Sequence, residues 1–297
     1  MKTVKGLHEK MGTFENANTS FHQAARCKRY TNEVLAFSMV KEEELLRATE
    51  EIQNLTYRQG EYKIFKVFEP KERLIMALPF YDRVVQHMIC NAIQPVFENG
   101  FYYHSYACRS GKGMHAASDT LYQWMYETEV KQGLRMYAFK GDISKYFASI
   151  PHDKLKDENR RYIGDKKALM LIDDIIDHNG ILPDGVGIPV GNLTSQLFAN
   201  VYGNKLDKFC KHVLHIPYFV RYMDDFIILS DDLEQLKEWV KRIEEFLENE
   251  MLLHINPKST ILYAGNGIDF LRIYPLCRPQ ESKKIIYQKV KARCKGV

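Results

Sequence analysis

The chain has 297 residues, a net charge of +4 at pH 7, and hydrophobic and aromatic fractions of 45% and 12%. These values exclude a disordered protein and predict a folded globular one with room for one or two subdomains. No apolar run reaches the ~18 residues that span a bilayer, and none follows the N-terminal residues, so we expect neither a membrane segment nor a secretory signal. The six cysteines include no Cys-x-x-Cys pair, which favours a reduced, cytoplasmic protein without disulfides or a zinc site.

Hydrophobic periodicity and turn residues predict an α+β protein in which helices cover an antiparallel sheet. In chain order, helices are expected at 14–29, 33–56, 81–98, 114–131, 193–212 and 233–251. Strands are expected at 62–68, 73–78, 134–143, 218–222, 226–230, 260–263 and 268–274. We find no internal repeat and no low-complexity linker between these segments.

The most unusual stretch is a predicted β-hairpin with two acids at its tip. The apolar runs 218–222 and 226–230 flank Asp224 and Asp225, where a solvated hairpin would normally place Asn-Gly or Asp-Gly. Two adjacent carboxylates repel each other, and divalent cations make such an arrangement favourable. The hairpin is therefore a first indication of a metal site.

Two other acid pairs in the chain show that adjacency alone is a weak signal. Asp173-Asp174 lies in a segment of helical periodicity, 168–177, which favours a solvated helix face. Asp231-Asp232 precedes the predicted helix 233–251 and fits a helix N-cap. A second acid in a similar setting is needed before Asp224 and Asp225 can be assigned to chemistry.

Asp142 supplies that second setting, at the end of the predicted strand 134–143 and directly after Gly141. Standing alone, this acid would most simply cap a turn. Together with Asp224 and Asp225 it gives three carboxylates on adjacent strands. Two Mg²⁺ ions held ~3.5–4 Å apart for phosphoryl transfer require such a set. We therefore predict a site for two Mg²⁺ ions, with Mn²⁺ as the alternative ion.

Three motifs, in this order, resemble the palm motifs of reverse transcriptases: Phe-Lys-Gly-Asp142-Ile-Ser-Lys-Tyr-Phe147, Gly-Ile-Pro-Val-Gly191-Asn-Leu-Thr-Ser-Gln196 and Tyr222-Met-Asp-Asp225. The resemblance covers about residues 60–275. Within that superfamily, Val-Gly-x-x-x-Ser-Gln replaces the more common Gln-Gly-x-x-x-Ser-Pro, as in the reverse transcriptases of diversity-generating retroelements. The Tyr-Met-Asp-Asp form agrees with that branch.

The resemblance implies a right-hand polymerase fold with fingers, a palm and a short or truncated thumb. The expected domains are an N-terminal helical extension (1–60), fingers (61–133, with part of 152–186), a palm (134–275) and the remnant or start of a thumb (276–297). Only 22 residues follow Pro275, too few for a full helical thumb. Lys and Arg gather in 283–295 without acids, so this tail either meets phosphate or is a solvated helix.

The resemblance also implies roles for individual residues. The implied metal ligands are Asp142, Ile143, Asp224 and Asp225, and Lys258 would protonate the pyrophosphate leaving group. The implied nucleotide-binding residues are Lys71, Arg73, Phe147, Val190, Gly191 and Gln196, of which Phe147 would exclude a 2′-hydroxyl. The implied template or primer contacts are Arg109, Tyr222 and Met223. From the residues alone, Lys71 and Arg73 would be surface charges and Lys258 a solvated turn lysine.

One departure from the family pattern bears on fidelity. Val190 stands where most members have Gln, so a polar contact near the nucleotide is lost, and in the retroelement branch this goes with misincorporation opposite template adenine. The expected function is thus an RNA-directed DNA polymerase of a diversity-generating retroelement, which copies a template RNA into adenine-mutagenised cDNA from deoxynucleoside triphosphates.

Two alternatives remain at this point: a retron, group II intron-like or phage-defence reverse transcriptase, and an inactive RNA-binding scaffold. The expected partners are template RNA, the cDNA or primer, and a basic oligomeric accessory protein, which a short thumb would make more necessary. We expect a cytoplasmic protein, encoded by a bacterium or a phage, that makes no contact with a membrane.

Overall fold

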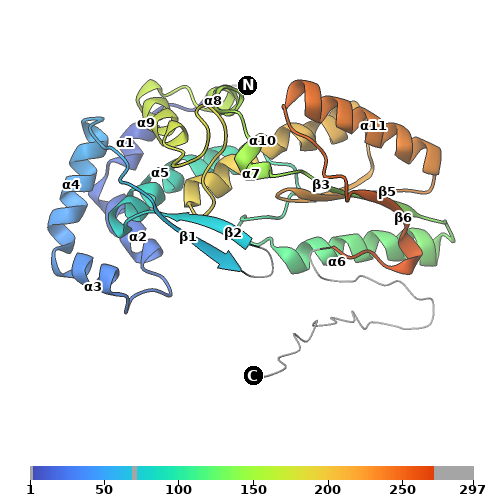
Figure 1. The fold of residues 1–297 in the computed structure, drawn as a ribbon, viewed down its shortest axis with the longest axis horizontal. Coiled ribbons are helices and arrows are strands. Elements are labelled where there is room, and N and C mark those ends of the chain that lie inside the picture. The colour runs from blue at the N-terminus through green and yellow to red at the C-terminus, as the bar shows by residue number, and fades with distance from the viewer. Residues whose placement is uncertain (1–2, 69–71, 271–297) are drawn as a thin grey trace. The chain divides into compact units, whose positions relative to one another are not determined.

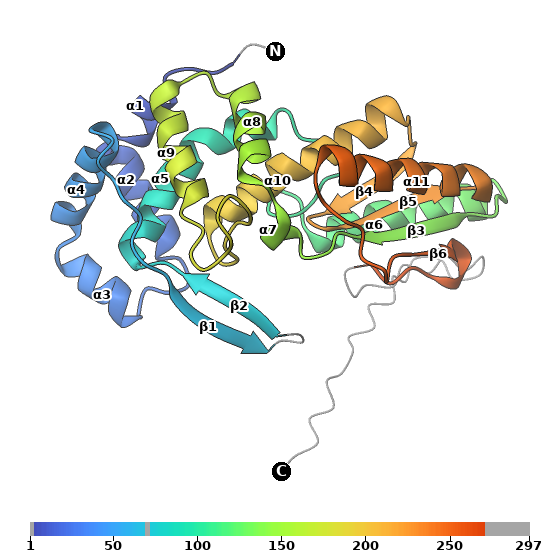
Figure 2. The ribbon, with the colours of Figure 1, turned by 45° about the horizontal axis from the view of Figure 1, so that its top comes forward.

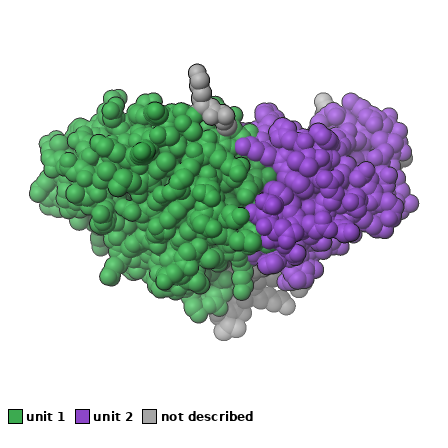
Figure 3. Space-filling model, turned by 90° about the horizontal axis from the view of Figure 1, so that it is seen from above, with its two compact units in different colours: residues 1–101, 145–205, 251–253 green, residues 102–144, 206–250, 254–297 purple. Residues whose placement is uncertain are grey.

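A computed structural model describes residues 3–68 and 72–270 of the chain. The chain divides into two compact units (Figure 3): unit 1 comprises residues 1–101, 145–205 and 251–253, and unit 2 comprises residues 102–144, 206–250 and 254–297. Residues 102–133 group with unit 2, so the units do not follow the predicted fingers boundary. The predicted thumb segment lies outside the described residues.

Unit 1 consists mainly of helices, shown in blue to yellow-green in Figure 1. Their bounds are α1 (Leu7–Met11), α2 (Phe14–Ala24), α3 (Asn32–Met39), α4 (Lys41–Gln53), α5 (Phe80–Glu98), α7 (Tyr146–Ser149), α8 (His152–Tyr162) and α9 (Lys166–Asp177). Apolar residues recur at helical spacing along α5, and α1, α2 and α3 pack against it. No helix among residues 3–68 and 72–270 is long and apolar enough to cross a bilayer.

The helix predictions for unit 1 are confirmed in type and corrected in detail. The single helix expected at 33–56 is wrong: the backbone of Val40 (φ −121°, ψ 27°) leaves the helical conformation and separates α3 from α4. Hydrophobic periodicity does not predict α1, α7 or α8, because the first two have only five and four residues and α8 is charged along most of its length.

The two strands of unit 1 form a hairpin of β1 (Lys63–Phe68) and β2 (Glu72–Ala77), as predicted. The strands pair antiparallel from Lys63 opposite Ala77 to Phe68 opposite Glu72. The hairpin projects from the helices of its unit as a separate ribbon (Figure 2). Most of its side chains are exposed and therefore accessible to a ligand.

Unit 2 contains a four-stranded antiparallel sheet in the order β4-β5-β3-β6. The strands are β3 (Tyr137–Asp142), β4 (Tyr218–Tyr222), β5 (Asp225–Ser230) and β6 (Thr260–Tyr263). Helices α6 (Met114–Met125) and α11 (Leu233–Glu250) lie on opposite sides of this sheet (Figures 1 and 2). Helix α10 (Leu193–Lys208) begins in unit 1 and ends in unit 2. The expected strand 268–274 is described only to residue 270.

The two faces of the sheet are distinguished by alternation along the strands. Ala138, Val220, Ile227 and Leu229 pack with α6 in one buried cluster. Residues two apart share a face, and so do residues directly opposite each other in an antiparallel pair. Asp142, which lies opposite Asp225, therefore belongs to the face of the sheet that α6 covers.

Gly141, next to Asp142, is required by close packing on the other face. The ring of the fully buried Phe226 lies directly over it, and a Cβ at position 141 would stand 2.3 Å from the ring atom Cζ. Phe226 also packs edge-to-face on Phe139, with ring centroids 5.8 Å apart, so the ring has little room to move. Only glycine allows β3 and β5 to pair at this point.

We predict that Gly141→Ala lowers the free energy of unfolding by about 1–3 kcal/mol, because the added methyl overpacks a rigid core. Urea denaturation of the single variant, of Phe226→Leu and of the double variant measures this. The smaller Leu makes room for the methyl, so the two costs should be less than additive in the double variant. Simple additivity would contradict the packing explanation.

Candidate active site

The three predicted carboxylates converge within unit 2. Asp142 is the last residue of β3 and Asp225 the first of β5, and the two are direct cross-strand partners. Asp224 precedes Asp225 in the two-residue turn that joins β4 to β5, where Tyr222 pairs with Asp225. Acids from two distant stretches of the chain thus meet at one end of the sheet, as the sequence predicts.

The turn that presents these acids has an uncommon backbone. Met223, its first residue, has a φ of 60°. A two-residue hairpin turn with positive φ at this position normally uses Gly, and a side chain there costs on the order of 1–3 kcal/mol. The amide of Ile143, just after β3, donates to the carbonyl oxygen of Asp224 (3.2 Å) and ties the turn to the segment that carries Asp142.

A loop that follows α11 holds Asp142 in place. The Asn256 side-chain amide donates to Oδ2 of Asp142 (2.6 Å), and its backbone amide donates to the Asp142 carbonyl (2.7 Å). The Asp142 amide in turn donates to the Ser259 hydroxyl (3.1 Å). The family resemblance points to Lys258 in this Asn-Pro-Lys-Ser loop but not to Asn256 or Ser259, because only the folded chain brings these two to β3. Lys258 itself is exposed, and its role as a proton donor stays a prediction.

The electrostatics of the site favour an added cation. Burial and, after it, the nearby carboxylates of Asp224 and Asp142 raise the pKa of the Asp225 carboxyl to about 6, although Lys140 lowers it. Lys140 is itself shared with Asp269, at 3.6 Å between Nζ and Oδ2. In the metal-free protein the acids therefore repel one another without full compensation.

The donor chemistry of this end of the sheet fits a hard divalent cation. Mg²⁺ takes one or two carboxylates together with substrate phosphate and water, rather than a closed protein cage. Asp142, Asp224 and Asp225 would supply such oxygens, and the Ile143 carbonyl stays a prediction. Over the ranges 3–68 and 72–270, no three His, Cys, Asp or Glu side chains already stand in metal-holding geometry. Binding of a metal ion by Asp142, Asp224 and Asp225 therefore stays a prediction.

The predicted nucleotide-binding residues lie in unit 1, apart from Lys71, which falls outside the described residues. The loop that carries Val190 runs beside β2, because the Met76 amide donates to the Val190 carbonyl (3.1 Å). Gly191 has a φ of 123°, and a Cβ there would stand 3.0 Å from the Met76 carbonyl oxygen. The structure therefore brings Val190 and Gly191 to the strand that bears the exposed Arg73.

Phe147 and Gln196 are placed around the same loop. The Ile188 amide donates to the Phe147 carbonyl (2.8 Å), so Phe147 at the start of α7 adjoins the segment leading to Val190. Gln196 lies in the first turn of α10 and is half-buried. Contact with a nucleotide stays a prediction for all of these residues.

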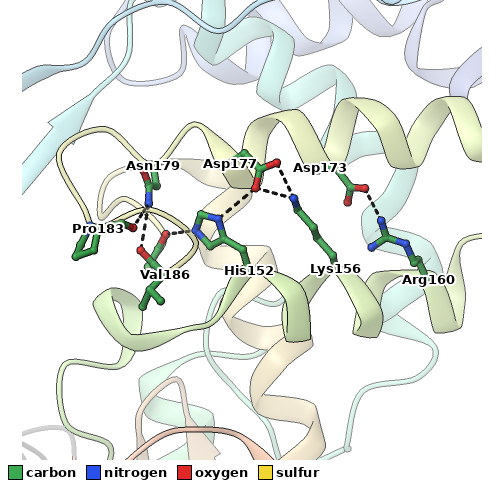
Figure 4. Close-up of polar contacts among 9 residues, drawn as sticks. His152, Lys156, Arg160, Asp173, Asp177, Asn179, Pro183 and Val186 are labelled. Atoms are coloured by element: carbon green, nitrogen blue, oxygen red, sulfur yellow. Dashed lines mark hydrogen bonds and ion pairs between the residues drawn. The ribbon is translucent and has the colours of Figure 1, made fainter.

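A network of hydrogen bonds around the buried His152 ties this loop to α8 and α9 (Figure 4). Nε2 of His152 lies 2.8 Å from the Gly187 carbonyl oxygen, and Nδ1 lies 3.3 Å from Oδ1 of Asp177, which also binds Lys156. The Asn179 side chain donates to two carbonyls further along the loop, those of Pro183 and Val186. These bonds hold the loop at Pro183 and Val186 through Asn179, and at Gly187 through His152.

The two comparison acid pairs prove structural. Asp232 caps α11, because its Oδ1 accepts from the amides of Glu234 and Gln235. Asp174 is exposed, and Asp173 is half-buried and pairs with Arg160 at 2.6 Å (Figure 4). Burial raises the pKa of the Asp173 carboxyl even though Arg160 lowers it.

The predicted template contacts lie near the acids in unit 2. Tyr222 and Met223 belong to the acid hairpin itself. Arg109 has a structural task, since its Nη1 donates to the carbonyls of Tyr102 (2.7 Å) and Ser105 (2.8 Å). Its role toward a template stays a prediction.

An antiparallel sheet with helices on it and acids at adjoining strand ends defines the class of right-hand polymerase folds. Among solved structures, telomerase from Candida albicans in complex with a fragment of telomeric RNA matches with a TM-score of 0.55 and 11% identity, over 73% of this chain and 45% of that one. At this identity the likeness concerns the fold alone. The chain belongs to the reverse transcriptase (RNA-dependent DNA polymerase) family, whose profile matches residues 66–283.

Two curated relatives are similar to parts of the chain. Protein YkfC of Escherichia coli is 25% identical over 236 residues, which are 64% of this chain and 59% of that protein. An uncharacterized 91 kDa protein in the cob intron of Schizosaccharomyces pombe is 30% identical over 137 residues, 44% of this chain and 16% of that protein. The chain thus spans little more than half of the first relative and a smaller share of the second.

We predict that Asp225→Asn stabilises the metal-free protein at pH 8 and that the gain shrinks toward pH 5. The raised pKa of Asp225 means that the folded state holds this proton more tightly than the unfolded state, so stability is lost as pH rises from about 4 through about 6. The difference between pH 5 and pH 8 should be on the order of 1 kcal/mol.

Thermal or urea unfolding in EDTA at both pH values measures this difference, with Asp231→Asn as the control for removing an acid. Excess Mg²⁺ should reverse the order of wild type and Asp225→Asn, because only an intact site gains stability from binding. A gain for Asp225→Asn that is the same at pH 5 and pH 8 would refute the proposed repulsion.

Proposed function

We propose that the chain is an RNA-directed DNA polymerase that extends a primer along an RNA template by metal-assisted nucleotidyl transfer. The single observation that carries this proposal is the cross-strand pairing of Asp142 with Asp225, next to Asp224 in the hairpin turn, in a chain of the reverse transcriptase family. Bound Mg²⁺ would neutralise charge on the attacking and leaving oxygens. The β1–β2 hairpin would serve as fingers and the sheet of unit 2 as palm.

In this proposal the protein's own residues bind and orient the substrates. Arg73 on β2, with Lys71, would bind the triphosphate, because a guanidinium offers bidentate donors to phosphate. Phe147 would lie against the sugar and exclude the 2′-hydroxyl, the only sugar difference between RNA and DNA nucleotides. Lys258, which is exposed in the loop that holds Asp142, would give its proton to the departing pyrophosphate.

We further propose that the enzyme belongs to a diversity-generating retroelement and writes adenine-directed errors into its cDNA. Support comes from Val190 in place of the usual Gln and from the Ser-Gln ending of the same motif. An apolar side chain offers no hydrogen bond to the nascent base pair, so geometry there is held less tightly. A basic, oligomeric accessory protein would help to hold template and primer.

An intron-encoded reverse transcriptase is the second candidate. The observation that favours it is the relative described as a protein in the cob intron. The two candidates share the chemistry at the acids and differ in template and outcome. The DNA beside the coding region separates them: a template repeat next to a variable repeat that differs at adenines supports the retroelement.

We expect Asp224→Asn to reduce primer extension on an RNA template by on the order of 100-fold or more, because a carboxylate that holds charge in the transition state is lost. The assay follows labelled primer with deoxynucleoside triphosphates in Mg²⁺, and again in Mn²⁺. Asp231→Asn is the matched control, since it removes an acid from another Asp-Asp pair. Comparable extension by Asp224→Asn would leave only a scaffold role.

We expect Val190→Gln to lower misincorporation opposite template adenine by several-fold while leaving other errors near their wild-type frequency. The backbone bond from Met76 to the Val190 carbonyl survives this substitution, so the loop keeps its place. Sequencing of cDNA from wild type, Val190→Gln and the apolar control Val190→Ile measures the error spectrum. An unchanged adenine error rate in Val190→Gln rejects the assignment.

A further inference from the structure

Behind the acid hairpin lies an ion pair that no sequence motif identifies. Arg221 on β4 and Asp207 near the end of α10 are both fully buried, and they form two parallel bonds: Nε to Oδ1 at 2.6 Å and Nη2 to Oδ2 at 2.7 Å. A buried ion pair contributes little to stability over well-packed apolar residues. Its geometry, rather than its energy, is the feature that needs a reason.

The remaining donors of Arg221 supply that reason. Nη1 donates to the carbonyl oxygen of Met223 (2.9 Å), the turn residue with a φ of 60°, and Nη2 also donates to the Ser105 hydroxyl (3.2 Å). Asp207 fixes the plane of the Arg221 guanidinium, and the bond from Nη1 to the Met223 carbonyl then holds the hairpin turn. The bond therefore restrains the least favourable backbone conformation of the acid hairpin.

The side chain of Arg221 lies on the face of the sheet opposite to that of the Asp225 carboxylate. Arg221 lies opposite Phe226, whereas the neighbouring pair is Tyr222 opposite Asp225. Because successive residues of a strand alternate, Arg221 and the carboxylate of Asp225 belong to opposite faces. The guanidinium is fully buried, and its Nη1 contacts the acid hairpin at the backbone of the turn.

The backbone of Arg221 is fixed as well. Its amide donates to the His104 carbonyl (3.0 Å), and its carbonyl accepts from the Tyr106 amide (3.0 Å). The segment around Ser105, the end of α10, β4 and the turn therefore meet at one residue. All of these parts lie in unit 2.

We propose that Arg221, oriented by Asp207, is a positioning residue that fixes the Met223–Asp224 turn so that Asp224 and Asp225 stay aligned with Asp142 for metal binding. The inference rests on the proposed polymerase function for its kinetic consequence. Its structural consequence is independent of activity: the bond from the Ile143 amide to the Asp224 carbonyl should open more often when Arg221 no longer holds the turn.

The main test uses the double variant Arg221→Met with Asp207→Leu, which removes both charges and leaves a packed apolar core. We expect a melting temperature within about 4 °C of wild type. We also expect hydrogen exchange at the Ile143 amide to rise tenfold or more while amides in the middle of β3 keep their rates. Binding of Mn²⁺, followed by calorimetry, should weaken about tenfold.

Kinetics separate positioning from a general loss of structure. In primer extension, kcat should fall ten- to a hundredfold and the Mg²⁺ requirement should rise, whereas KM for the deoxynucleotide should stay within about twofold. Arg221→Lys keeps the charge beside Asp207 but lacks the planar fork, so it should show the same changes in smaller measure. Arg47→Met, on α4, controls for the loss of an arginine elsewhere.

Each outcome decides the proposal. Unchanged Ile143 exchange and unchanged kcat in a folded Arg221 variant would overturn it. Failure of both Arg221 variants to fold would overturn it too, because the pair would then be a requirement of folding. If the wild type extends no primer, the polymerase function fails, while Ile143 exchange and Mn²⁺ affinity still decide whether Arg221 positions the turn.

Discussion

The structure depends on the antiparallel pairing of β3 with β5, which sets Asp142 opposite Asp225. Two like charges in a cross-strand pair are unfavourable, so this register persists only because the rest of unit 2 enforces it. The Phe226 ring fills the space over Gly141, helices cover both faces, and the Asn256 loop holds Asp142 from beyond the strand end. A bound cation would relieve this repulsion.

The two units carry different parts of the proposed chemistry. In unit 2, burial and the neighbouring carboxylates raise the pKa of Asp225, and in unit 1 a loop is fixed beside the strand that bears Arg73. In the proposed nucleotidyl transfer both sets would be needed: the carboxylates would hold the cation, and Arg73 would bind the triphosphate.

Local patterns predict much of this structure, and long-range contacts account for what they miss. Alternation and turn residues identify both hairpins, and Asp142, Asp224 and Asp225 follow from acids placed where strands end. Asn256 and Arg221 escape, because their importance lies in hydrogen bonds to residues far along the chain. The break at Val40 escapes because it leaves the apolar period of its segment unchanged. Helix α8 escapes because it is charged along most of its length and shows too little of that period.

Metal-directed cleavage tests whether the acids of β3 and β5 share a bound cation. Fe²⁺ bound in place of Mg²⁺ reacts with added hydrogen peroxide to give hydroxyl radicals, and ascorbate returns the Fe³⁺ to Fe²⁺. The radicals cut the backbone next to the ion, and mass spectrometry locates the cuts. We expect cuts near both 142 and 224–225, and the loss of both in Asp225→Asn. Cuts at only one of these segments, or cuts that survive the substitution, would contradict it.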